Sequence, residues 1–178
     1  MEESPQLWKE YSNTLASSSI DKALFSINKN IDDTIEGAKR EKVIEEAKWF
    51  LKIPYKTGGK NINGFDCSWF VNYIYKRVTQ KILWVSSRDI YKKLHIYQID
   101  ASNTKSWDLV LFKNKQWIID HVEIVINYDA NQKKFTSIGS AIVAEKKWDI
   151  AWVNERTRSL KNDRREYIFI NTSHILKS

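Results

Sequence analysis

The chain has one cysteine, Cys67, among its 178 residues, so it cannot contain an internal disulfide. A single thiol also says little about the redox compartment. No run of residues approaches the roughly 20 consecutive apolar positions of a membrane-spanning helix. The acidic start, Met1 to Pro5, lacks the apolar stretch of a secretion signal. Internal repeats and low-complexity tracts are absent as well.

The composition that is present suits one compact domain. Hydrophobic residues make up 42% of the chain, an ordinary fraction for a globular protein of this length. Residues 1–60 carry ten basic and ten acidic side chains, so the whole net charge of +7 lies in residues 61–178. A basic surface attracts polyanions. Because Lys146-Lys147 and Arg164-Arg165 are isolated pairs with no nucleic-acid motif around them, we expect no nucleic-acid partner.

Cys67 stands at an abrupt change of pattern. The segment from Gly64 to Ser68 is polar and turn-prone, and residues 70–78 then repeat apolar side chains at helical spacing. A helix therefore begins at or near the cysteine. The first turn of a helix favours the thiolate over the thiol, and its free N–H groups can hold an oxyanion. This pattern indicates a nucleophile, the alternative being a small buried side chain with no chemical role.

A cysteine nucleophile needs a base, and His121 is the best placed of the three histidines. His121 opens an apolar, strand-like run that follows the predicted cysteine helix. By contrast, His95 lies in a lysine-rich stretch and His174 in a polar tail, where surface positions are expected. An imidazole can take the thiol proton and return it to the leaving amine, so no metal or cofactor is predicted.

Four ordered segments are similar to the NlpC/p60 family of cell-wall cysteine peptidases. They are Pro54-Tyr55 with Gly58-Gly59, Phe65-Asp66-Cys67-Ser68, Asp108-Leu109-Val110-Leu111-Phe112, and His121-Val122-Glu123-Ile124. The resemblance covers about residues 41–140. It implies an α+β, papain-like fold with N-terminal helices packed on a central antiparallel β-sheet. We expect residues 1–40 to form a helical extension and residues 41–178 a single catalytic domain.

Apolar spacing also predicts individual elements. Three helices are expected before the cysteine helix, over residues 7–15, 20–31 and 43–51, with a break at residues 17–19 and a stop at Pro54. From Asp108 onward the pattern changes to strands at hairpin spacing, closing with residues 167–170.

The resemblance implies a third catalytic group that orients the histidine. The family usually supplies His, Asn or Gln from the next strand, and Ser137 stands at the matching position of this sequence. A serine hydroxyl can accept a hydrogen bond from imidazole. A backbone carbonyl, Glu123 or Ser140 are the alternatives. Strand alternation puts Glu123 on the same face as His121, unless that end of the strand is solvated and the carboxylate simply faces water.

Four further residues are expected at the substrate site. The resemblance places the phenol of Tyr55 near the cysteine, where it would donate to the oxyanion or shape the pocket. Asp66 and Ser68 flank the thiol and would recognise a substrate ammonium group, or else cap the helix. Trp69 stands where the family usually has a small residue, so its ring is expected either to line the groove or to turn into the core.

The resulting hypothesis is hydrolysis of an amide bond in bacterial peptidoglycan stem peptides through a thioester. This serves either wall remodelling or an antibacterial effector, and a small inhibitor or immunity protein is a possible partner of the latter. The alternatives are a CHAP-type amidase, a cysteine deamidase or transferase acting on a protein, and a non-catalytic wall-binding module. Such a substrate implies the cell envelope or a secreted protein, without a classical signal peptide in this chain.

Overall fold

A computed structural model of the chain describes residues 5–143, 150–161, 163 and 165–176. Lys146, Lys147 and Arg164, considered above for nucleic-acid binding, lie outside these residues. The chain divides into two units, Met1–Gly37 and Ala38–Ser178. No helix among the described residues is long and apolar enough to cross a membrane. The domain boundary predicted at residue 40 remains a prediction.

The N-terminal region forms one helix, α1 (Pro5–Lys48). The predictions of separate helices over residues 7–15, 20–31 and 43–51, with a break at residues 17–19, were therefore wrong. Serine lowers helix propensity only modestly, and neither proline nor glycine occurs between residues 6 and 36 to interrupt the backbone. The helix ends before Trp49, in turns that lead to Pro54.

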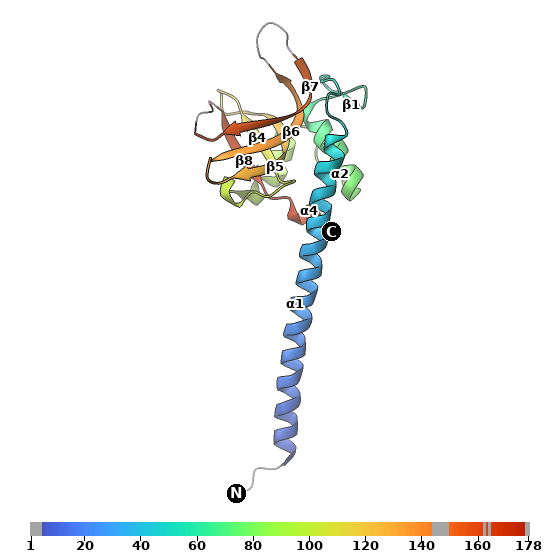
Figure 1. The fold of residues 1–178 in the computed structure, drawn as a ribbon, viewed down its shortest axis with the longest axis vertical. Helices are drawn as coiled ribbons and strands as arrows, with labels where there is room; N and C mark the ends of the chain where they lie inside the picture. Colours follow the sequence, from blue (N-terminus) through green and yellow to red (C-terminus); the bar gives the residue numbers. More distant parts are fainter. Residues whose placement is uncertain (1–4, 144–149, 162, 164, 177–178) are drawn as a thin grey trace. The chain divides into compact units, whose positions relative to one another are not determined.

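The second unit is built around an antiparallel sheet, which Figure 1 shows from its β6 and β7 side. The described strands lie in the order β3-β8-β4-β5-β6-β7. Their bounds are β3 (Gln98–Ile99), β4 (Leu109–Lys113), β5 (Ile119–Asp129), β6 (Lys134–Val143), β7 (Ile150–Ser159) and β8 (Glu166–Ile170). A separate short ladder joins β1 (Lys60–Asn61) to β2 (Gly64–Phe65). The predicted change from helices to antiparallel strands is confirmed.

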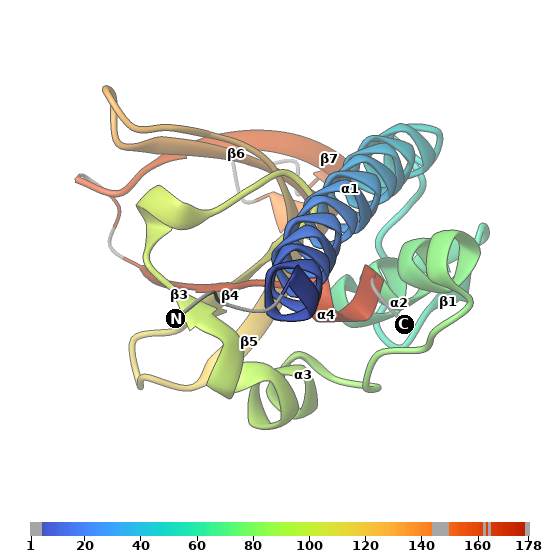
Figure 2. The same cartoon turned by 90° about the horizontal axis from the view of Figure 1, so that it is seen from below.

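Helices α2 (Cys67–Thr79) and α3 (Ser87–Leu94) both pack against β5, as Figure 2 shows for α3. The remaining helical segments are the 3₁₀ turns η1 (His95–Tyr97) and η2 (Ala101–Asn103) and the short α4 (Ser173–Leu176). Asp66 caps α2 by accepting a hydrogen bond from Trp69 N at 2.8 Å. This cap fixes Cys67 as the first residue of the helix.

The sheet buries both of its faces. Leu109 and Leu111 of β4 pack with Val122 and Ile124 of β5 in the main core beneath α2. The alternate residues of β4 point to the other face, where a second cluster contains Val110, Phe112, Val125, Phe135 and Phe169. Because His121 pairs with Phe112 and Glu123 with Val110, both side chains lie on this second face.

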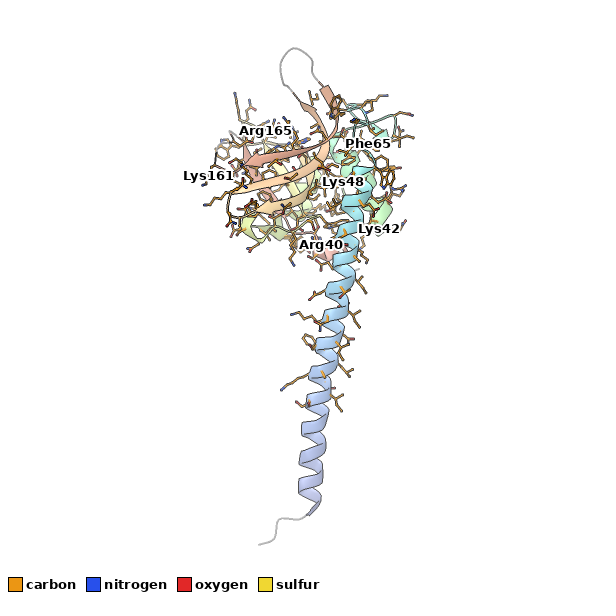
Figure 3. The ribbon with its side chains drawn as sticks, viewed as in Figure 1. Arg40, Lys42, Lys48, Phe65, Lys161 and Arg165 are labelled. Carbon is orange, nitrogen blue, oxygen red and sulfur yellow. The ribbon has the colours of Figure 1, made fainter. Side chains whose placement is uncertain are left out.

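A buried ion pair joins the last turns of α1 to the sheet. Arg40, labelled in Figure 3, places Nη1 3.4 Å from Asp108 Oδ1 and 2.6 Å from the carbonyl of Ser106. Asp108 is fully buried and also accepts hydrogen bonds from Thr172 N and Lys105 N. Asp108, one of the residues that carried the resemblance, therefore links its own loop to α1 and to the segment after β8.

Candidate active site

The thiol of Cys67 opens into a cavity of about 1030 Å³. Cys67 is partly buried, and Tyr55 and His121 line the same cavity. The rest of the lining comes from β4, β5 and the loop between them, from β6 and β7, and from β8 with the segment before it: Phe112, Asn114, Lys115, Gln116, Asp120, Ala141, Ile142, Arg156, Thr157, Arg158, Ser159, Asp163, Arg165 and Tyr167. The cysteine thus lies at an open site, which an inert buried thiol would not.

His121 bridges the thiol and a carboxylate. Its Nε2 atom is 2.9 Å from Oε1 of Glu123, and the imidazole also interacts with the Cys67 side chain. The ring of Phe112 contacts the imidazole edge-on, with centroids 4.9 Å apart. The contacts with Glu123 and Phe112 therefore fix the position of the imidazole beside the cavity.

Glu123 is the side chain that orients His121 in this structure. Its carboxylate is only 1% exposed, so the alternative that it faces water was wrong. Ser137 was predicted to contact the imidazole; its hydroxyl instead donates to Oε2 of Glu123 at 2.6 Å. Ser140, another alternative, donates to the carbonyl of Phe65. The serine side chain is shorter than that of glutamate. The Glu123 carboxylate lies between Ser137 and His121 and contacts both.

The contact between His121 and Glu123 shifts the pKa of each side chain in the direction that favours its charged form. Burial alone would lower the pKa of His121, but its hydrogen bonds to Cys67 and Glu123 and the nearby carboxylate raise it to about 9. Burial alone would raise the pKa of Glu123, but the hydrogen bond to His121 and the charge of Arg158 lower it to about 2. At neutral pH the site therefore contains an imidazolium and a carboxylate.

Tyr55 lies next to the thiol, as the resemblance implied. Burial raises the pKa of its phenol, opposed by a hydrogen bond to Thr57, and the charges of Cys67 and Asp66 raise it further. The phenol therefore keeps its proton and can donate it to an oxygen bound beside Cys67.

Asp66, Ser68 and Trp69 are not among the described residues that line the cavity. Asp66 accepts from Trp69 N and from Ser68 Oγ, whose hydrogen also reaches the carbonyl of Val85. These contacts fit the capping alternative. Trp69 is partly buried, and Lys60 Nζ lies 4.7 Å from its ring centre. Its ring is thus neither core nor cavity wall, and a role in substrate binding remains a prediction for all three.

Sequence reasoning missed Arg158, which contacts Glu123 from β7. In a strand that reads Asn154-Glu155-Arg156-Thr157-Arg158 every side chain is polar and three are charged, so nothing in that pattern distinguishes a buried arginine from a solvated one. Among the described residues, no group of three or more His, Cys, Asp or Glu side chains could hold a metal ion.

Comparison with known proteins agrees with this fold. The NlpC/P60 family profile matches residues 52–160. Protein P54 of Enterococcus faecium is 34% identical over 68 residues, which are 36% of this chain and only 13% of that protein. The solved NlpC/p60 domain of the peptidoglycan hydrolase SagA superposes with a TM-score of 0.53 at 22% identity, over 75% of this chain and 98% of that one.

A second solved structure, an NlpC/P60 family protein from Bacillus cereus, also gives a TM-score of 0.53, at 26% identity over 66% of this chain and 34% of that one. Since the family profile covers more than half of the sequence, the chain belongs to the NlpC/P60 family. The predicted resemblance and the α+β fold class are confirmed.

Proposed function

We propose that this protein is a cysteine peptidase or amidase that hydrolyses an amide bond of peptidoglycan stem peptides. The observation that carries the proposal is the contact series from the Cys67 thiol through His121 to the buried carboxylate of Glu123. These groups are a nucleophile, a base and an orienting anion in the order that nucleophilic catalysis uses. Membership of the family supports the substrate class.

In the proposed mechanism the Cys67 sulfur attacks the amide carbonyl, and its proton resides on His121. The imidazolium then gives that proton to the departing amine, which leaves a thioester on Cys67 and a free amine product. Water attacks the thioester with His121 as the base, so that the carboxyl product leaves and the thiol is restored. Glu123 stabilises the imidazolium throughout.

The negative oxygen that forms during each attack needs hydrogen-bond donors. The amides of Cys67 and Ser68 precede the first backbone hydrogen bond of α2, which Phe70 N makes to Asp66 O at 3.0 Å. Those two amides and the phenol of Tyr55 are the donors that we assign to the oxyanion.

The cavity suits an anionic peptide. Lys115, Arg156 and Arg165 lie in its lining together with Asp120 and Asp163. This excess of basic groups favours substrates that carry carboxylates, and the attraction weakens with added salt.

The test is to incubate the protein with purified peptidoglycan and to identify the products by mass spectrometry. Matched new amine and carboxyl ends within the stem peptide are expected, and they locate the bond. A cut between sugar and peptide would instead support the CHAP-type amidase. Sedimentation with the wall without products would indicate a binding module, and inactivity on the wall with deamidation of a protein substrate would favour a deamidase. Peptidoglycan from the source cell and from competitors, used in parallel, distinguishes remodelling from an antibacterial role.

A further inference from the structure

Arg158 forms two hydrogen bonds with the carboxylate of Glu123, the side chain that contacts His121. Its Nη1 atom lies 2.7 Å from Oε2 of Glu123, and its Nη2 atom lies 2.9 Å from Oε1. Nη1 also donates to Ser137 Oγ at 2.8 Å, and that hydroxyl donates to the same carboxylate. A two-point contact of this kind fixes the plane of a carboxylate as well as its position.

Aromatic rings and burial hold Arg158 and Glu123 in this arrangement. The guanidinium lies over the ring of Phe112 at 4.8 Å and near the ring of Phe135 at 6.0 Å. The Arg158 side chain is 13% exposed and that of Glu123 only 1%. Because a buried carboxylate without partners is costly, Glu123 depends on Arg158 as well as on His121 to stay charged in this place.

Gly139 provides the space through which Glu123 reaches the histidine. A Cβ atom placed on Gly139 would lie 2.5 Å from Cγ of Glu123 and 3.2 Å from its Cδ. Real Cβ atoms do not approach other atoms so closely, so any larger residue would displace the Glu123 side chain. Gly139 lies on β6, the strand that separates β5 from β7.

We propose that Arg158 and Gly139 are positioning residues for the reaction. Arg158 holds the Glu123 carboxylate against His121, and Gly139 leaves room for it to lie there. The group that orients the base is thus assembled from three neighbouring strands, β5, β6 and β7, rather than supplied by one residue. Its effect on turnover rests on the proposed function, whereas its effect on His121 does not.

A competing explanation is that Arg158 acts on its own, since it also lines the cavity and could bind the substrate. The two explanations predict opposite changes in His121. Among the described residues, the charged or titrating groups that act on Glu123 and His121 are Cys67 from α2 and Arg158 from β7, together with the polar Ser137 of β6. The β4 residues paired with them, Val110 and Phe112, are apolar. Removing a nearby cation raises the pKa of an imidazole, whereas losing the Glu123 contact lowers it.

The experiment is an NMR titration of the His121 ring in the full chain without substrate, in wild type, Arg158→Gln, Glu123→Gln and the double variant. The His121→Ala variant assigns the signal among the three histidines. We expect the His121 pKa to fall in Arg158→Gln from about 9 towards 6.5, as in Glu123→Gln, with little further change in the double variant. An unchanged or higher pKa in Arg158→Gln would overturn the proposal.

Peptidoglycan turnover provides the second readout. We expect Arg158→Gln to lower kcat/KM by on the order of tenfold to a hundredfold, with partial recovery in Arg158→Lys.

The Gly139→Ala substitution should lower activity when it is made in the wild-type protein. In a Glu123→Ala background, where the clashing Cγ is gone, the same substitution should change activity by less than about twofold. Losses that add fully in the combined variants would contradict the proposal. Arg77→Gln, which removes the surface pair between Arg77 of α2 and Glu46 of α1, is the matched control.

The two readouts separate failure of this inference from failure of the proposed function. If wild type does not cut peptidoglycan but the His121 titration shifts as expected, the positioning role holds and the function is wrong. If Arg158→Gln is too unstable to study, Gly139→Ala keeps Arg158 and still tests the contact through the same titration. A His121 pKa that stays near 9 in folded Gly139→Ala overturns the inference for Gly139.

Discussion

Glu123 follows His121 by two residues on one strand, and its Oε1 atom lies 2.9 Å from the imidazole Nε2. The proposed base and the side chain that orients it therefore come from the same face of one strand. In the family pattern, the orienting group stands on the next strand, at the position that Ser137 holds here. Because the Ser137 side chain is short and Gly139 has none, the longer Glu123 side chain occupies the space there.

Glu123 should matter more to catalysis than Ser137. Glu123→Gln keeps the shape of the side chain but removes the anion that stabilises the imidazolium, so we expect kcat to fall by about a hundredfold. Ser137→Ala removes one of several hydrogen bonds to the carboxylate, and a loss of only about twofold to tenfold is expected. Steady-state rates on a soluble stem peptide measure both; an equal or larger loss in Ser137→Ala would return the orienting role to serine.

The His121–Glu123 pair should also stabilise the folded protein over a limited range of pH. The folded pKa of His121 is raised to about 9 from 6.5, so its contribution is complete below pH 6.5 and is lost as pH rises through 9. The folded pKa of Glu123 is lowered to about 2 from 4.5, so its contribution is complete above pH 4.5 and is lost as pH falls through 2.

The two contributions overlap fully between pH 4.5 and 6.5. We therefore expect the difference in melting temperature between wild type and Glu123→Gln to be largest in that interval and to shrink towards pH 9. Thermal melts followed by circular dichroism at pH 3, 5.5 and 9 measure it. A difference that grows towards pH 9 would show that the charges are not paired as described.

Tyr55 tests the assignment of the oxyanion donors. Tyr55→Phe keeps the ring beside Cys67 but removes the phenol proton, so kcat should fall by about tenfold while KM changes little. A change confined to KM would mean that the phenol binds the substrate in its ground state.

Asp108 should be a structural residue rather than a catalytic one. Asp108→Ala removes the buried carboxylate that contacts Arg40, Thr172 and Lys105, and we expect the free energy of unfolding to fall by about 3–5 kcal/mol. The matched control is Arg77→Gln, which removes an exposed pair of about 0–1 kcal/mol. Urea unfolding compares the two. If Asp108→Ala unfolded like wild type, the Arg40–Asp108 contact would have no importance for stability.

The sequence was sufficient for the parts of the site that local pattern determines. The change from a polar turn to helical spacing identified the start of α2 at Cys67, and strand alternation placed Glu123 on the face of His121. The long α1 was missed because a run of three serines looks like a break, although serine is tolerated within helices.

The contacts between strands could not be predicted in the same way. Whether Glu123 meets water, Ser137 or His121 depends on the pairing of β5 with β6 and on the space at Gly139. Arg158 depends further on the pairing of β6 with β7, which places it opposite Phe135. Such register is set by the whole sheet, and a single sequence contains no local signal for it.

Capture of the covalent intermediate on Cys67 is the decisive test of the proposed mechanism. The protein is mixed with a soluble stem peptide, quenched in acid within the first turnover, and analysed by intact mass and peptide mapping. We predict a mass increase equal to the acyl half of the substrate, on the peptide that contains Cys67 and removable by hydroxylamine, and no such adduct in Cys67→Ala. Turnover of the same substrate by Cys67→Ala, or an adduct on another residue, would contradict a mechanism in which this thiol attacks the amide.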